Sequence, residues 1–93
     1  MPPDAATTRP ARRNGAEEHR LDDEVLLFVP SSEQAFTLNR SAVAIWELCD
    51  GIRTIEEITE ELGQCIGRSR TALLTDVIQG VTRLYELGLL ELR

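Results

Sequence analysis

Residues 36–58 read FTLNRSAVAIWELCDGIRTIEEI, and this stretch decides the fold class because a strand end is followed by two marked helix starts. Asn39 is a favourable N-cap and Gly51 a favourable helix terminator, so one helix is predicted between them. Thr54, with a glutamate three residues later, has the spacing of a capping box. A second helix is therefore predicted over residues 55–62.

Upstream of this stretch, the pattern indicates strands. Residues 24–29, EVLLFV, are rich in β-branched and aromatic side chains and are ended by Pro30. Residues 34–38 alternate polar and apolar side chains, which is the period of a strand. A third strand is expected near residues 18–22. The front of the chain is thus predicted to form a small antiparallel sheet.

Downstream, a longer third helix is expected. Ser69 or Thr71 can cap it, and it runs to about Leu87 before Gly88 ends it. Residues 89–92 then form a short extended segment. The predicted fold is α+β: a small antiparallel N-terminal sheet followed by three helices, similar in outline to a winged helix-turn-helix.

The third helix carries two apolar ridges, which together form a wider apolar arc than one core requires. The first ridge is Leu73, Val77, Gly80, Leu84 and Leu87, and the second is Leu74, Ile78, Val81 and Tyr85. Either the helix is buried on two sides, or one ridge accepts a partner. The sequence does not choose between the ridges.

The domain boundaries follow from the N-terminal composition. Residues 1–16 contain three prolines and small polar side chains without an apolar period, so we expect a disordered arm there. Residues 17–93 are expected to form one recognition domain. The formal net charge is −6, divided into +1 over residues 1–20 and −7 over residues 21–93.

This charge argues against nucleic acid and anionic membranes as partners, because both require a basic surface. The sequence also lacks a run of about 20 apolar residues that could span a bilayer and an N-terminal secretory signal. We therefore expect a cytoplasmic protein with reduced thiols.

The sequence offers no catalytic or metal-binding constellation. Its one histidine, His19, lies far from Cys49 and Cys65, and the two cysteines lack the spacing of a zinc site. Cys49 is expected to be a small core residue, and Cys65 has no base beside it. We expect no enzyme activity, no metal and no cofactor.

Three binding functions remain. A winged-helix DNA-binding regulator would read bases with the third helix, but Arg70, Gln79 and Arg83 are opposed there by acidic side chains. A peptide-binding domain would use residues 34–38 as an open sheet edge, with an apolar ridge beside it. A domain that holds two enzymes together is the third possibility.

Several motifs resemble one family. They are the strand and helix entry at residues 36–42, the helix end at residues 45–51, the capped start at residues 53–58 and the ending LYELGLL at residues 84–90. Over about residues 19–92 the chain is similar to the pyrroloquinoline quinone biosynthesis protein D-like family.

The resemblance implies a RiPP recognition element, which is a chaperone for a ribosomally made precursor peptide. Such a domain binds the leader region of the precursor and presents it to a modifying enzyme, either a radical S-adenosylmethionine protein or a lasso-type protease or cyclase. In the family the leader adds as a strand and rests against the third helix, which correspond here to residues 35–38 and 71–87.

The predicted peptide-binding residues combine this implication with the edge and the first ridge. Backbone groups of residues 35–38 would set the register, apolar side chains would form pockets, and two arginines would flank the cleft. The set is Ala35, Phe36, Thr37, Leu38, Arg70, Leu73, Val77, Gly80, Arg83 and Leu84.

Overall fold

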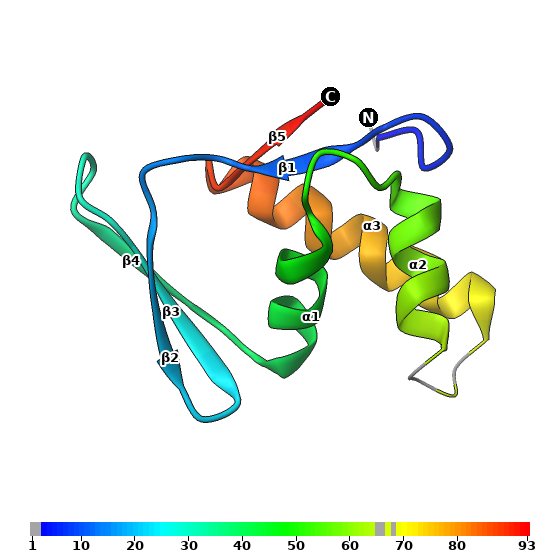
Figure 1. The fold of residues 1–93 in the computed structure, drawn as a ribbon, viewed down its shortest axis with the longest axis horizontal. Helices are drawn as coiled ribbons and strands as arrows, with labels where there is room; N and C mark the ends of the chain where they lie inside the picture. Colours follow the sequence, from blue (N-terminus) through cyan, green and yellow to red (C-terminus); the bar gives the residue numbers. More distant parts are fainter. Residues whose placement is uncertain (1–2, 65–66, 68) are drawn as a thin grey trace.

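The computed structural model describes residues 3–64, 67 and 69–93, and within them the chain forms five strands and three helices (Figure 1). In chain order the elements are β1 (Pro10–Arg12), β2 (Glu17–Leu21), β3 (Glu24–Val29), β4 (Gln34–Leu38), α1 (Arg40–Leu48), α2 (Ile55–Gly63), α3 (Arg70–Glu86) and β5 (Leu90–Leu92). The predicted α+β class is confirmed.

The three helices begin at the predicted caps. Asn39 Oδ1 accepts a hydrogen bond from the amide of Ala42 at 2.9 Å. Thr54 and Glu57 exchange both bonds of a capping box, at 2.9 and 3.2 Å. Ser69 caps α3 by accepting from the amide three residues on, which decides between the two cap residues that the sequence allowed. These local signals fix where each helix starts.

Strands β2, β3 and β4 form an antiparallel sheet in that order, so β2 and β4 are its edges. The turn between β2 and β3 has two residues and closes on the pair Leu21–Glu24. On the other side of β3, Leu27 pairs with Phe36. Figure 1 shows this sheet on one side of α1, with α2 and the N-terminal half of α3 on the other side.

The expected disordered arm is corrected by the structure. Pro10–Arg12 forms β1, which pairs antiparallel with β5 at the other end of the chain. Ala11 is only 4% exposed, so this strand is part of the core boundary. The sequence of the arm contains no apolar period because a three-residue strand is too short to show one. Its order comes instead from long-range contacts.

These contacts satisfy backbone groups at two helix ends. The carbonyls of Ala5 and Thr8 accept hydrogen bonds from the first two amides of α2, at 3.0 and 3.1 Å. Arg12 donates to the carbonyls of Trp46 and Glu47 near the end of α1, at 3.0 and 2.9 Å. Because helix ends leave such groups without intrahelical partners, the arm stabilises both helices.

The core lies where α1, α2 and α3 meet the inner face of β3 and the start of β5. Cys49 is fully buried there, as expected for a small core residue. The main members of the core are Val25, Leu27, Ile45, Trp46, Ile55, Ile58, Leu73, Val77, Val81, Leu84 and Leu90. Among the described residues, the helices do not reach the length and hydropathy that crossing a bilayer requires.

α1 ends with Cys49 as its C-cap, so Gly51 lies in the turn beyond the helix and not, as predicted, directly at its end. It is needed in this turn for two reasons. Its φ of +79° is unfavourable for other residues, and an added Cβ would lie 2.7 Å from Arg93 Nη1 and 3.1 Å from Ala11 Cβ. We expect Gly51→Ala to lower the free energy of unfolding by about 1–2 kcal/mol, measured by urea denaturation. Gly63→Ala is the matched control, because a Cβ there has room and its φ is not positive. Equal stability of the two variants would contradict this reading of Gly51.

Candidate functional site

A groove lies between the open edge of β4 and the C-terminal half of α3. Its volume is about 400 Å³. It is lined by Ala35, Phe36, Thr37, Leu38, Asn39, Ala42, Gly80, Arg83, Leu84 and Leu87. We call it the β4–α3 groove. It contains seven of the ten residues that the sequence analysis predicted for peptide binding.

The backbone of β4 presents hydrogen-bonding groups to this groove. Leu21 and Glu24 flank a two-residue turn, and a turn of this length is closed by a hydrogen-bonded pair. Bonded and non-bonded pairs then alternate along the antiparallel ladder. Every second residue of β3 from Val25 therefore bonds to β4, through the even-numbered residues of β4. The N–H and C=O groups of Ala35 and Thr37 consequently point to the open edge, where a further strand would bond.

Side chains of β4 alternate between the two faces of the sheet. Leu38 is buried and Phe36 is half-buried against the core, whereas Ala35 and Thr37 are exposed. From the helix side, Leu84 is buried and Leu87 is half-buried. The groove thus combines an unpaired backbone edge with an apolar wall, as β-strand addition requires.

Gly80 lies at the base of this wall, with a packing role different from the expected one. From the sequence, Gly80 was expected to allow the backbone of a bound partner to approach closely. An added Cβ would instead lie 2.7 Å from Cδ1 of Ile45, so Gly80 mainly lets α1 and α3 pack closely. It still lines the groove, where it leaves the helix surface low.

Three predicted site residues lie elsewhere, and this corrects the expected groove. Leu73 and Val77 are buried between α1, α2 and α3, because α2 covers the N-terminal half of the ridge. Arg70 Nη2 pairs with Glu56 and Glu60 of α2, at 3.6 and 3.7 Å. The helix beside the groove is therefore only the C-terminal half of α3.

Three lining residues were absent from the predicted set. Asn39 and Ala42 enter the groove because α1 starts directly after β4 and turns back beside it. Leu87 belongs to the first apolar ridge and was available as a signal. The short connection between strand and helix was the signal for the other two, since it keeps the first turn of α1 next to the edge strand.

Among the described residues, Arg83 is the one charged side chain that lines the β4–α3 groove. Within the described part of the chain it has no ion pair. At least one ion pair is formed by each of six other arginines, namely Arg9, Arg20, Arg40, Arg53, Arg70 and Arg93. The side chain is exposed, so its charge faces solvent at the rim of the groove.

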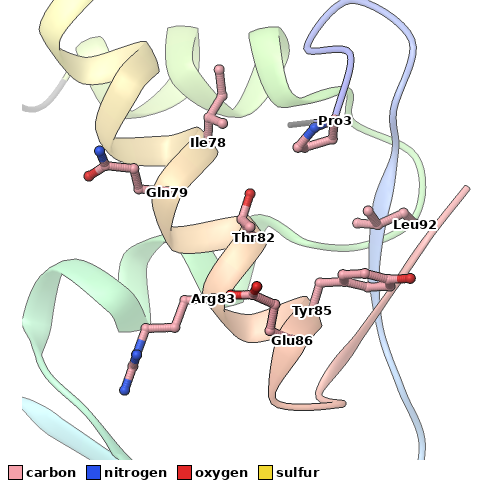
Figure 2. Close-up of a pocket in the computed structure, with 8 residues that line it drawn as sticks. All are labelled: Pro3, Ile78, Gln79, Thr82, Arg83, Tyr85, Glu86 and Leu92. Carbon is pink, nitrogen blue, oxygen red and sulfur yellow. The ribbon is translucent and has the colours of Figure 1, made fainter. Parts of the chain in front are cut away.

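A second hollow, of about 700 Å³, lies on the opposite face of α3 (Figure 2). The second ridge contributes Ile78 and Tyr85 to it, and Leu92 of β5 and Pro3 complete its apolar part. The C-terminal part of the first ridge and two residues of the second therefore face different hollows, whereas Val81 of the second ridge is buried in the core. This hollow is larger, but Leu92 is the only strand residue among the described residues that line it, so it offers less backbone edge than the β4–α3 groove.

The ionisable groups show no reactive centre among the described residues. Burial raises the pKa of the Cys49 thiol to about 12, so the thiol stays protonated near neutral pH. The backbone amides of Arg53 and Ile52 donate to the Asp50 carboxylate and hold the pKa of this carboxyl below its usual value. Asp50 therefore stabilises the turn after α1. The described residues contain no group of side chains suited to a metal ion. Cys65 lies outside the described residues.

Comparison with known proteins agrees with this geometry. The family model of coenzyme PQQ synthesis protein D (PqqD) matches residues 24–90, which include the edge strand, all three helices and the start of β5. Among curated proteins the comparison finds no match.

Three solved structures share the fold. TbiB1 in complex with the TbiA(beta) leader peptide has a TM-score of 0.78 at 23% identity, over 87% of this chain and 94% of that one. Lasso peptide synthetase B1 complexed with the leader peptide has a TM-score of 0.78 at 20% identity, over 89% and 98%. The PqqD truncation of Methylobacterium extorquens PqqCD, a stand-alone RiPP recognition element, has a TM-score of 0.75 at 23% identity, over 95% and 93%.

Proposed function

The chain belongs to the family of coenzyme PQQ synthesis protein D, and from this premise we propose that it binds the leader region of a ribosomally made precursor peptide. The leader adds as a strand to the open edge of β4 and lies against the C-terminal half of α3. One observation carries the proposal: the outward N–H groups of Ala35 and Thr37 and the apolar wall of α3 line the same groove. Two of the structures with this fold are complexes with leader peptides.

We further propose that the chain is a non-catalytic chaperone in the cytoplasm that delivers the leader to a modifying enzyme. The enzyme is a radical S-adenosylmethionine protein or a lasso-type protease or cyclase. The groove supports a binding role, since the described residues of its lining include neither a nucleophile beside a base nor a pair of carboxylates. Main-chain bonding along β4 supplies affinity, and the pockets around Phe36 and Leu84 supply selectivity.

The first test is the set of genes beside this one, together with a titration. We expect a short precursor and a modifying enzyme to be encoded there. A synthetic peptide with the leader sequence of that precursor should bind the isolated chain in isothermal titration calorimetry, without the enzyme present. A domain that only joins two enzymes would give no heat with the leader alone.

A gel shift with duplex DNA at low salt tests the winged-helix alternative. A DNA reader binds at least non-specifically under these conditions, because phosphate contacts dominate there. With a net charge of −6 and Arg70 paired with two glutamates, we expect no shift. A shift without leader binding would replace the proposed function by a regulatory one.

A further inference from the structure

The charge of the β4–α3 groove differs from that of the whole chain. The chain carries −6, yet the described residues that line the groove include one ionised side chain, the arginine at position 83. Most other described arginines are neutralised by an acidic neighbour. Among the described arginines, the side chains of Arg13 and Arg83 form neither a hydrogen bond nor an ion pair. Arg83 lines the groove, whereas Arg13 lies on the N-terminal segment outside it. Because the described residues provide no acidic partner for this guanidinium, a bound ligand can provide one.

The position of Arg83 on α3 determines where such a partner would sit. With about 100° per residue along a helix, it lies between the face with Gly80 and Leu84 and the face with Ile78 and Tyr85. Figure 2 shows its guanidinium pointing away from Tyr85. Arg83 lines both hollows, the second one together with Glu86. In the β4–α3 groove it lies together with residues 35–39, so its charge is beside the path of an added strand.

We propose that the peptide bound in the β4–α3 groove carries an aspartate or glutamate at the position beside Arg83. This inference rests on the proposed function and adds a chemical requirement to the leader. A guanidinium binds a carboxylate through two parallel hydrogen bonds, which gives a preference at one position in addition to the charge. The other side chains of the lining are apolar or uncharged, so they favour apolar side chains at the other positions of the bound peptide.

The test is a selection of random-sequence peptides by display on the wild-type chain, on Arg83→Glu and on Arg83→Gln. Peptides that bind Thr37→Pro as tightly as the wild type are discarded, because their binding does not depend on the β4 edge. The wild type should enrich an acidic side chain at one fixed position of an apolar pattern. Arg83→Glu should enrich lysine or arginine at that same position. Arg83→Gln, which keeps most of the aliphatic stem, should lose the preference.

Affinities of the selected peptides give the magnitude. An acidic peptide selected on the wild type should bind Arg83→Glu about tenfold more weakly at low salt, since an exposed pair contributes at most about 1 kcal/mol and reversal adds repulsion. The difference should shrink as salt is added. Arg13→Glu is the matched control, with the same charge change outside the groove, and should bind within about twofold of the wild type.

The outcomes distinguish failure of the acidic-residue requirement from failure of the proposed function. Edge-dependent peptides with the same sequence pattern on all three chains would overturn the requirement for an acidic residue and leave the proposed function intact. Failure to obtain any peptide that depends on the β4 edge would contradict the proposed function, and this inference with it. A switch of the preferred charge between wild type and Arg83→Glu supports both.

Discussion

Thr37→Pro is expected to weaken binding of the leader peptide by about 5- to 150-fold while the domain stays folded. The N–H of Thr37 points to the open edge, so proline removes a donor that the added strand uses. Leaving the peptide carbonyl unpaired costs about 1–3 kcal/mol, which gives this range of Kd. Calorimetric titration of the leader measures the loss, and circular dichroism checks the fold.

Two further variants make this result specific to the backbone. Thr37→Ala changes the same side chain but keeps the N–H, so its affinity should stay close to that of the wild type. Phe36→Pro removes an amide that bonds to β3, so it should destabilise the sheet itself. Thr37→Pro with wild-type affinity would show that the leader does not bond to this edge.

Removal of residues 1–16 is expected to lower the free energy of unfolding by roughly 2–4 kcal/mol. The truncation removes β1 from β5, the hydrogen bonds from Arg12 to the end of α1 and the carbonyl acceptors at the start of α2. Each such bond contributes about 0.5–1.5 kcal/mol, partly offset by the entropy of ordering the segment. Urea denaturation followed by Trp46 fluorescence measures the change.

A point variant tests the same contact without shortening the chain. Ala11→Glu places a charge where Ala11 is 4% exposed, and we expect a comparable loss of stability. Arg13→Glu, which introduces the same side chain at an exposed position two residues on, should be nearly neutral. If the truncated chain is as stable as the full one, the arm is not part of the folded domain.

Elements with local signals could be predicted from the sequence. Asn39, Thr54 and Ser69 each cap a helix through a bond to an amide three residues on, so the motif and the structure lie within one turn. The edge strand was visible because residues 34–38 alternate. The same alternation located the backbone half of the candidate site.

Features that depend on distant packing could not be predicted. Pro10–Arg12 becomes a strand because β5 lies beside it, and that partner is at the other end of the chain. Leu73 and Leu84 belong to one ridge, and only the position of α2 decides that the first is core and the second lines the groove. A ridge on a helix predicts that the helix is buried but does not say which element covers it.

The most direct test of strand addition at β4 is amide hydrogen exchange by NMR, residue by residue, with and without a saturating concentration of the leader peptide. The amides of Ala35 and Thr37 should become strongly protected on binding, because only they point to the open edge. The amides of Phe36 and Leu38 already bond to β3 and should change little. Unchanged exchange at Ala35 and Thr37 in the bound state, or new protection along β2 instead, would contradict the account.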